Sequence, residues 1–503
     1  MPGPGADPAV KVCCGCGFSR RLRFQLALSA SMPAPERGVV AIVGGGITGL
    51  AAAHALSSKT ERVRIVLIEA EGELGGKVRT RELAGLPVES GPDAFLTRAR
   101  EAVELCQALD LGPDLIAPSR LPAQIWDGRH LHRIPAGLVL GAPVRLRPLA
   151  RSGILSPRGL ARAGLEPLMP SHVPAGDHSV RELIVPRFGV EVFDRLVDPL
   201  LGGIYAGSAD QLSAESVLPQ LVEAARGRRS LILAMRQRRP EASTQPTFYS
   251  LRGGLSRLIT GLEQSLSGVK VHRGQPVEAV WRGPGGEYLL RVGSGTLSAS
   301  SVILAAPAHV AARLTATLDS GLAADLAGID HADVATVALT YARSALPRPL
   351  QSSGFLVPSR AQRLLVGMTA TSSKWPHLGE GTSHGQPTFV LRAAVGRAGD
   401  TAWMAMDDDQ LLASVHAELA SALGLTSSPL EGWVTRWPAA LPQYTVGHGA
   451  RLRRLDEALG RLPGLFLAGA GYRGIGLPAC IAQGQSAARF ALEHTIAAAR
   501  GEG

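Results

Sequence analysis

Aromatic residues and cysteine are both scarce in this chain of 503 residues. Phe, Trp and Tyr together make up 4% of it, and the five cysteines are Cys13, Cys14, Cys16, Cys106 and Cys480. The first three crowd together and the last two stand alone, which gives neither a disulfide framework nor the paired ligands of a zinc site. We therefore expect no metal site, and this cysteine usage fits a reducing cytoplasm.

Long apolar runs are also missing. No stretch reaches the roughly 18 to 20 uninterrupted apolar residues of a transmembrane helix, because the apolar segment at 464 to 481 contains Gly, Pro and Arg. The chain is nevertheless 45% hydrophobic, enough to bury a large core in two or three domains. We expect a globular protein that does not span a membrane.

Acidic residues are outnumbered by basic ones, 42 to 52, and the formal net charge is +10. The basic residues are scattered and no aromatic-plus-basic motif occurs, so we expect no nucleic-acid partner. An anionic membrane surface, an acidic ligand and a solvated surface without function all stay open. The stretch from Arg133 to Pro170 is rich in Arg, Pro and Leu, and we predict that it docks peripherally on the inner face of the membrane.

Residues 1 to 37 are set aside from the fold prediction. Arg20, Arg21 and Arg23 precede the apolar run FQLALSA, which is too short for a convincing targeting segment. Met32 lies a few residues before the first strand pattern. We expect this extension to be disordered or to result from an upstream start codon.

A glycine-rich segment joins a strand pattern to a helical pattern. Val40, Ile42 and Val43 suit a strand that is covered on both faces, and the Ala/Leu-rich run Leu50 to Leu56 begins a helix. Between them lies Gly44-x-Gly46-x-x-Gly49. In such a turn the glycines permit a tight bend, the approach of a pyrophosphate and close helix packing. The segment therefore predicts a nucleotide-binding turn.

Two features downstream support this interpretation. A second strand pattern, Val63 to Ile68, ends at Glu69, twenty residues beyond Gly49, where a ribose-binding carboxylate belongs. The block LGGKVRT at 74 to 80 then supplies a second glycine pair, which looks like the extension of flavoproteins of the amine oxidase and phytoene desaturase type. This likeness favours FAD over NAD as the cofactor.

Three later segments return to the nucleotide domain. They are a strand, turn and strand at 269 to 280, a strand at 301 to 305, and a strand at 465 to 469 followed by a helix at about 481 to 499. The segments between them are long insertions. We predict an α/β protein with a Rossmann-type FAD-binding domain built from 38–98, 250–310 and 433–500. A helical subdomain occupies 99–249, and an α+β substrate domain occupies 311–432, with strands at 334 to 341 and 388 to 394 and a helix at 408 to 423.

Six further blocks occur in order along the chain. They are ESGPDAFLTR (89–98), DPLLGGIYAGSADQLS (198–213), LRGGLSRL (251–258), SGFLVP (353–358), RWPAALPQYTVGH (436–448) and FLAGAGYRGIGLPACIAQG (466–484). With the two glycine blocks they strongly resemble the flavin-dependent porphyrinogen oxidase family of haem biosynthesis, in its bacterial form. The matches cover nearly everything after residue 38, and IYAG and PQYTVGH are the most specific of them.

The resemblance implies roles for individual residues. It assigns the pyrophosphate to Gly44, Gly45, Gly46, Ile47, Thr48 and Gly49, and the ribose and adenine end to Glu69, Ala70 and Val277. It assigns the surroundings of the flavin to Gly76, Lys77, Gly91, Pro92, Asp93, Ala94, Trp437, Ile475, Gly476 and Leu477. The chain departs from the family at Ala479, where an acidic residue is usual, which weakens inference about polar groups near that turn.

A porphyrinogen is a flat, apolar macrocycle edged with propionates, so its site needs apolar walls and arginine partners. By family position the wall candidates are Gly203, Tyr205, Phe355 and Leu356, and the cationic candidates are Arg98 and Arg129. An ordinary surface role stays open for each arginine, as does an ordinary core role for Trp437. No catalytic residue is assigned.

The resemblance implies an FAD-dependent oxidase that converts a porphyrinogen to the porphyrin with dioxygen, releasing hydrogen peroxide. The substrate is coproporphyrinogen III or protoporphyrinogen IX, a choice that the sequence leaves open together with the oligomeric state. A partner that receives the porphyrin in haem biosynthesis is also expected. The alternatives are another amine oxidase or desaturase-type flavoenzyme, which would lack IYAG and PQYTVGH, and a porphyrin carrier without catalysis.

Overall fold

A sheet of five parallel strands carries the glycine-rich turn. The computed structural model describes residues 38–59, 61–169, 176–237, 246–378, 381–383 and 386–500, so the expectations for residues 1 to 37 lie outside the described residues. The strands run in the order β12 (Val269–His272), β2 (Arg64–Ile68), β1 (Val39–Val43), β16 (Ser301–Leu304) and β23 (Leu465–Leu467). These segments lie far apart in the sequence, and each contains one of the apolar runs that predicted a strand of the nucleotide domain.

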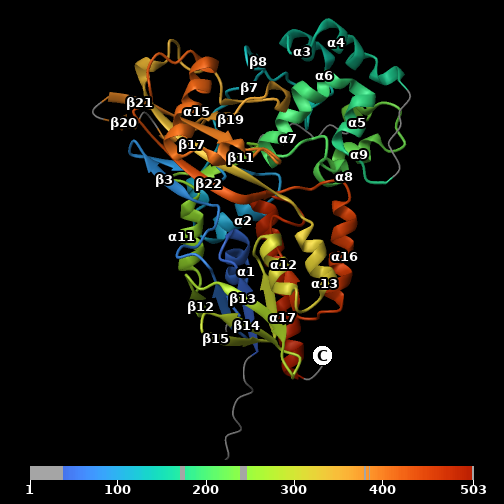
Figure 1. Cartoon of the computed structure of the whole chain (residues 1–503), viewed down its shortest axis with the longest axis vertical. Helices are drawn as coiled ribbons and strands as arrows, with labels where there is room; N and C mark the ends of the chain where they lie inside the picture. The colour runs from blue at the N-terminus through green and yellow to red at the C-terminus, as the bar shows by residue number, and fades with distance from the viewer. Residues whose placement is uncertain are drawn as a thin grey trace, which may run out of the picture. The chain divides into compact units, whose positions relative to one another are not determined.

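Helices α1 (Ile47–Ser57) and α17 (Leu477–Arg500) lie side by side against this sheet (Figure 1). Their contact is close, because a Cβ on Gly484 of α17 would come within 2.2 Å of the Thr48 carbonyl oxygen. Helix α1 is buried almost throughout, which explains why its sequence is apolar on every side. Helices α2 (Glu101–Ala108) and α11 (Ser256–Gln264) add to the same hydrophobic core.

The other side of the parallel sheet is covered by a small antiparallel sheet and by helices. The sheet consists of β13 (Val277–Arg282), β14 (Tyr288–Val292) and β15 (Gly295–Ala299). The helices are α12 (Ala308–Thr315), α13 (Ser320–Ala327) and α16 (His448–Gly460). The predicted strand, turn and strand at 269 to 280 is therefore present, but its two strands belong to different sheets.

A second large sheet stands over the nucleotide-binding part (Figure 1). Its strand order is β22 (Glu431–Pro442), β17 (His331–Ala342), β21 (Gln386–Val395), β19 (Leu365–Ala370), β18 (Gly354–Leu356), β7 (Ala123–Trp126) and β8 (Leu131–Arg133), with β20 (Gly381–Ser383) paired to β21. Helix α15 (Asp408–Leu423) has the bounds predicted for it, because Asp407 forms a capping box and Gly424 ends the helix at a φ of 70°.

Three strands depart from the predicted domain division. Strands β7 and β8 come from the stretch 99–249, which was predicted to be helical, yet they extend the second sheet next to β18. Strand β22 runs through the boundary predicted at 433. Runs of three or four residues such as AQIW and LHR are too short to show a strand period. AQIW becomes a strand because β18 offers an edge to pair with, and LHR pairs in turn with β7. The domain boundaries themselves stay a prediction.

The rest of the stretch 99–249 is largely helical and has its own hydrophobic core. Its helical run from Val180 to Tyr205 is interrupted at Gly189, which has a φ of 89°, and contains a π-helical turn at Phe193–Val197. None of the helices in the part of the chain that the structure describes is long and apolar enough to span a membrane. After α2, the α-helices of the stretch 99–249 are α3 (Leu146–Ser152), α4 (Pro157–Gly164), α5 (Val180–Phe188), α6 (Val190–Val192), α7 (Asp198–Tyr205), α8 (Ala214–Val217), α9 (Pro219–Ala225) and α10 (Leu231–Gln237).

Candidate cofactor and substrate site

The nucleotide-binding turn is held in place by close backbone contacts. Gly44 has a φ of 107°, and its N–H donates to the Ile68 carbonyl oxygen at 2.8 Å. A Cβ on Gly49 would lie 1.9 Å from the Gly44 carbonyl oxygen, which only glycine avoids. These contacts bring the start of α1 directly against the ends of β1 and β2.

Gly46 faces open space at the N-terminus of α1. A Cβ built on it would meet no described heavy atom within 4 Å, and the residue is the extended N-cap of α1 without a side-chain cap. Ile47 and Thr48 follow as buried residues of the first turn. The first N–H groups of the helix therefore point toward a space that an anion can fill. This cradle fits the pyrophosphate of a dinucleotide.

Glu69 extends from the end of β2 toward this turn. Its Oε2 accepts a hydrogen bond from the Gly45 N–H at 2.5 Å, and its Oε1 accepts one from the Glu71 N–H at 2.8 Å. The Gln275 N–H donates to the Glu69 carbonyl oxygen at 3.0 Å, which brings Val277 at the start of β13 close to Glu69 and the exposed Ala70. Each oxygen of a carboxylate can accept two hydrogen bonds, so Glu69 can keep these bonds and still accept one from a ribose hydroxyl.

The second glycine pair lies beside the first. The Gly75 N–H donates to the Gly45 carbonyl oxygen at 2.8 Å, and a Cβ on Gly76 would come within 3.3 Å of the Gly46 Cα. Lys77 follows, and burial lowers the pKa of its amine. A Cβ on Gly91 would lie 1.8 Å from the Lys77 carbonyl oxygen. The two predicted flavin-contact segments, 76–77 and 91–94, are therefore neighbours in the fold.

The loop Gly91 to Ala94 is tied to the second sheet by charged side chains. Asp93 accepts a hydrogen bond from Lys374 Nζ at 2.7 Å and lies 3.5 Å from Arg392 Nη1. Burial alone would raise the pKa of Asp93, but Lys374 and Arg392 hold it down at about 2. Trp437 Nε1 donates to the Ser90 carbonyl oxygen at 2.8 Å just before this loop. The ion pairs and this bond fix the loop between the two sheets.

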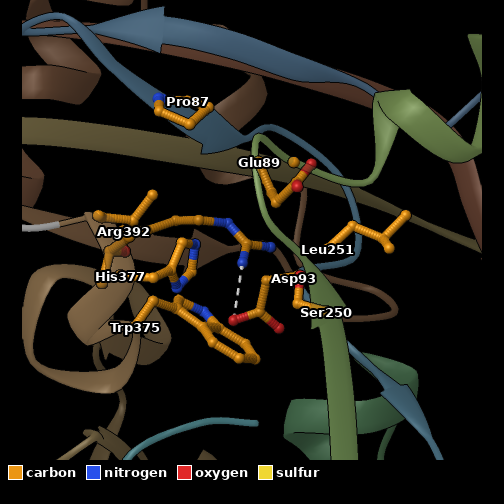
Figure 2. Close-up of a pocket in the computed structure, with 11 residues that line it drawn as sticks. Pro87, Glu89, Asp93, Ser250, Leu251, Trp375, His377 and Arg392 are labelled. Carbon is orange, nitrogen blue, oxygen red and sulfur yellow. Dashed lines mark ion pairs between the residues drawn. The ribbon is translucent and has the colours of Figure 1, made fainter. Parts of the chain in front are cut away.

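A small pocket lies behind this loop (Figure 2). Figure 2 shows the ion pair of Asp93 with Arg392 as a dashed line, with Glu89 and Trp375 close by. Its other lining residues are Pro87, Ser250, Leu251, Gly254, Thr371, His377 and Leu378. The lining combines ionic and hydroxyl side chains with the apolar side chains of Pro87, Leu251, Trp375 and Leu378.

Glu89, the last residue of β4 (Leu86–Glu89), is buried in the wall of this pocket with 8% of its surface exposed. Its Oε1 accepts a hydrogen bond from the Leu255 N–H at 2.6 Å, and its Oε2 accepts one from Thr80 Oγ1 at 2.9 Å. Burial raises the pKa of Glu89 to about 7 despite these bonds. The carboxyl group therefore changes its charge near neutral pH.

Glu89→Gln should flatten the pH dependence of stability. Because the pKa of Glu89 rises from 4.5 to about 7 on folding, the folded protein between these values keeps a proton that the unfolded chain releases. The free energy of unfolding then falls as the pH rises through this window, by about 3 kcal/mol for a difference of this size. Urea unfolding at pH 5 and pH 8 should show this loss in the wild type and little of it in Glu89→Gln. The exposed Glu82→Gln serves as control, and equal slopes in all three proteins would contradict the assignment.

The loop before α17 forms the other end of the site. The Gly474 N–H donates to Tyr444 Oη at 2.8 Å, and Tyr444 Oη donates to the Ala470 carbonyl oxygen at 2.6 Å. Tyr444 also stacks on His448 with ring centroids 4.1 Å apart. Ile475 is half-buried, Gly476 is exposed and Leu477 begins α17. Exposed backbone at Gly476 and the N-terminus of α17 suit the edge of a flavin ring.

The predicted wall residues meet this loop only in part. Tyr205 lies 5.9 Å from the Tyr444 ring, and a Cβ on Gly203 would contact the Leu356 side chain at 2.7 Å. Phe355, in contrast, is 2% exposed and packs on Trp126 inside the second sheet. Successive side chains of β18 point to opposite faces, so Phe355 supports the sheet while Leu356 remains available as a wall.

The two cationic candidates lie on the surface. Arg98 is exposed after β5 (Phe95–Leu96), and Arg129 is exposed in the turn between β7 and β8. A third arginine, Arg397, lies closer to the wall residues, with its Nη1 3.1 Å from a Cβ on Gly202 and its Nη2 donating to the Val357 carbonyl oxygen at 2.8 Å. Burial lowers the pKa of Arg397.

Sequence reasoning missed the residues that link the blocks. Tyr444 and His448 stand inside the PQYTVGH block, whose specificity was the only signal available for them. Gln443, in the same block, donates from Nε2 to the Tyr205 carbonyl oxygen at 2.8 Å and so joins it to the IYAG block. Lys374 and Arg392 stand in no quoted block, and only the fold reveals their contact with Asp93.

Known proteins resemble this chain in sequence and in fold. Residues 47–492 match the family described as flavin containing amine oxidoreductase. The chain is 35% identical over 469 residues to a coproporphyrinogen III oxidase of Bacillus subtilis (strain 168), covering 90% of this chain and 98% of that protein. It is 31% identical over 469 residues to a protoporphyrinogen oxidase of Homo sapiens, covering 89% and 97%. A crystal structure of a protein from Exiguobacterium sp. 255-15 has a TM-score of 0.81 at 34% identity, covering 90% of this chain and 98% of that one.

The glycine cradle and these likenesses place the chain among the FAD-binding oxidoreductases, with FAD as its cofactor. More narrowly, it belongs to the flavin-containing amine oxidoreductase family and, within it, to the porphyrinogen oxidases. The contacts assigned to single residues of this chain stay predictions.

Proposed function

We propose that this protein oxidises a porphyrinogen, coproporphyrinogen III or protoporphyrinogen IX, to the porphyrin with FAD and dioxygen. The observation that carries the proposal is the continuity between the predicted flavin end and an apolar wall. Tyr444 contacts the loop before Gly476 through Gly474 and packs on Tyr205 of the IYAG block. Relatives at 35% and 31% identity are named as oxidases of these two porphyrinogens.

Bound FAD would supply a two-electron acceptor for hydride from the macrocycle, and dioxygen would take the electrons and become hydrogen peroxide. Because the porphyrin has six hydrogen atoms fewer than the porphyrinogen, three such rounds with three dioxygen molecules would complete the oxidation. The chain's own residues would orient the two partners. The half-exposed Tyr205, Leu356 and Ile475 would lie along the apolar faces of the macrocycle and exclude water. The exposed Gly476 would let the ring approach the backbone at the start of α17.

Anaerobic reduction of the flavin by each porphyrinogen tests this function. The yellow absorbance of the purified protein should bleach within the first turnover with the natural substrate and return when dioxygen is admitted. Comparing the two bleaching rates identifies that substrate. Bleaching by a primary amine but by neither porphyrinogen would make the protein another flavoenzyme of the family, and bound porphyrin without bleaching would make it a carrier. A colour that does not return with dioxygen would point to a different electron acceptor.

Arg129→Ala should raise the Michaelis constant roughly ten- to a hundredfold, because a charge-assisted bond to a propionate contributes about 1.5 to 3 kcal/mol. The Arg129 N–H donates to Asp127 Oδ1 at 2.9 Å, and this backbone bond survives the substitution. FAD content should not change. Unaltered kinetics with both porphyrinogens would mean that Arg129 does not bind the substrate, and Arg98 would be the next candidate. A larger loss with the four-propionate substrate would identify coproporphyrinogen as the natural one.

Peripheral membrane docking of the Arg133 to Pro170 stretch stays a proposal. Two of its leucines are strongly exposed, Leu165 at 47% and Leu168 at 69%, and Leu233 on the adjoining α10 is 50% exposed. Arg151 and Arg158 are exposed in the same stretch. Such a surface should bind anionic liposomes at low salt and release them at high salt in a flotation assay. Failure to float at low salt would contradict docking, and Leu165→Ser with Leu168→Ser should weaken it without loss of FAD.

A further inference from the structure

The hairpin of β7 and β8 gathers two histidines and a carboxylate. Asp127 follows β7, His130 precedes β8 and His132 lies in β8. The potential ligand atoms of the three side chains all lie within 4.8 Å of one another. His130 and His132 are two residues apart, the spacing that puts side chains on one side of an extended chain. The prediction that the chain has no metal site rested on its cysteines and did not weigh this D-x-x-H-x-H pattern.

The carboxylate of Asp127 is already oriented by the turn. Its Oδ1 accepts hydrogen bonds from the Arg129 N–H at 2.9 Å and the His130 N–H at 2.7 Å. Its Oδ2 faces His132 Nε2 at 3.0 Å. One carboxylate oxygen is therefore used by the backbone, and the other is left at the position where the imidazoles converge.

We propose that Asp127, His130 and His132 bind a divalent transition-metal ion, with Zn²⁺ as the best fit. Neighbouring ligand atoms around tetrahedral zinc are about 3.3 Å apart at the usual bond lengths of about 2.0 to 2.1 Å. The Asp127–His132 pair needs to open by only a few tenths of an ångström to admit the ion. His130 is exposed and can turn inward, and water would complete the four ligands.

The charges around the hairpin indicate the class of metal. Arg129 and Arg133 are exposed beside it, and Arg363 donates from Nη2 to the Gly128 carbonyl oxygen at 3.0 Å. Arg363 also lies over the Trp126 ring at 5.2 Å. With one carboxylate among several guanidinium groups, the site offers little to Mg²⁺ or Ca²⁺, which need several oxygen ligands. Imidazole nitrogen is a preferred ligand of Zn²⁺, Cu²⁺ and Ni²⁺.

Zinc titration of the FAD-loaded full chain against a chromophoric chelator tests the site. The chain should carry Cys13→Ser, Cys14→Ser and Cys16→Ser, so that these thiols do not compete for the ion. One zinc ion should bind, and a large excess of Mg²⁺ should not displace it. His130→Ala with His132→Ala should abolish binding. His416→Ala, on α15 and in contact with Tyr341 Oη, is the matched control and should bind as the parent does.

A second variant separates ligation from folding of the turn. Asp127→Asn keeps an oxygen for the two backbone N–H groups but replaces the carboxylate, so zinc affinity should fall roughly tenfold or more while the hairpin remains. Electron paramagnetic resonance of bound Cu²⁺ should show coupling to imidazole nitrogen in the parent and not in the double histidine variant. Absence of bound zinc in the parent, or equal affinity in the histidine variant, would overturn the proposal and leave Asp127 and His132 as an ordinary hydrogen-bonded pair.

Discussion

Gly46→Val should give a folded protein that carries no flavin. A Cβ at Gly46 meets no described heavy atom within 4 Å, and the residue has the extended backbone that valine adopts readily. The added side chain therefore fits the fold but occupies the space in front of α1 where the pyrophosphate would bind. Absorbance at the flavin maximum after purification should fall to the background, while circular dichroism and the thermal midpoint should match those of wild-type apoprotein.

Two other glycines make this result interpretable. Gly460→Val adds the same side chain at an exposed helix end where a Cβ also meets no described atom within 4 Å, so it should keep its flavin. Gly49→Ala forces a Cβ to within 1.9 Å of the Gly44 carbonyl oxygen and should lower the stability of the apoprotein itself. If Gly46→Val retained a full complement of flavin, the pyrophosphate would have to lie elsewhere.

The wild-type flavin should be released by acid precipitation, leaving a yellow supernatant, because no covalent link is expected. Of the two cysteines in the described residues, Cys480 lies at the predicted flavin end, in the first turn of α17. Burial raises its pKa to about 11, which keeps it protonated and unreactive. Colour that stays with the pellet would contradict non-covalent binding.

The nucleotide half of the site could be predicted because its signals are local. The strand, glycine turn and helix at 39 to 57 follow one another within a short segment, and each pattern has one physical cause. Helix α15 was predicted to the residue for the same reason, since its capping box and terminal glycine are adjacent in the sequence. Such elements can be predicted because the hydrophobic period, the capping residues and the turn residues all lie close together in the sequence.

The substrate half could be predicted only in outline because its contacts are long-range. The ion pair of Asp93 with Lys374 joins residues 281 positions apart, and no period or motif signals it. Phe355 and Leu356 are adjacent in one matching block, yet a strand turns one inward and the other outward. Which of them faces the substrate depends on strand register, because a shift of one residue exchanges the faces.

The Arg133 to Pro170 stretch likewise contains long-range contacts that its sequence did not predict. Its composition predicted a docking surface, but the stretch also contains Glu166, which is 1% exposed. Glu166 Oε1 accepts a hydrogen bond from the Leu231 N–H at 2.6 Å, and its Oε2 accepts one from Ser230 Oγ at 2.6 Å. Arg187 of α5 lies 3.5 Å from Oε1 and is 3% exposed. This carboxylate anchors the stretch to two other helices.

Glu166→Ala should therefore lower the free energy of unfolding by about 3 to 5 kcal/mol, the usual result of removing one partner of a buried ion pair. The substitution leaves the Leu231 N–H buried without its acceptor and takes the carboxylate away from the Arg187 guanidinium. Urea unfolding followed by circular dichroism measures the change. FAD content of the folded fraction should not alter, because the cradle at α1 belongs to a different core.

Glu215→Ala is the matched control, since Glu215 pairs with Arg226 at the surface, where the two side chains are 39% and 61% exposed. A solvated pair of this kind contributes at most about 1 kcal/mol. If both variants lost the same free energy of unfolding, Glu166 would contribute no more to stability than an exposed ion pair does. A large loss confined to Glu166→Ala, with weaker liposome flotation of the folded fraction, would mean that this buried carboxylate also holds Leu165 and Leu168 in the orientation that docking needs.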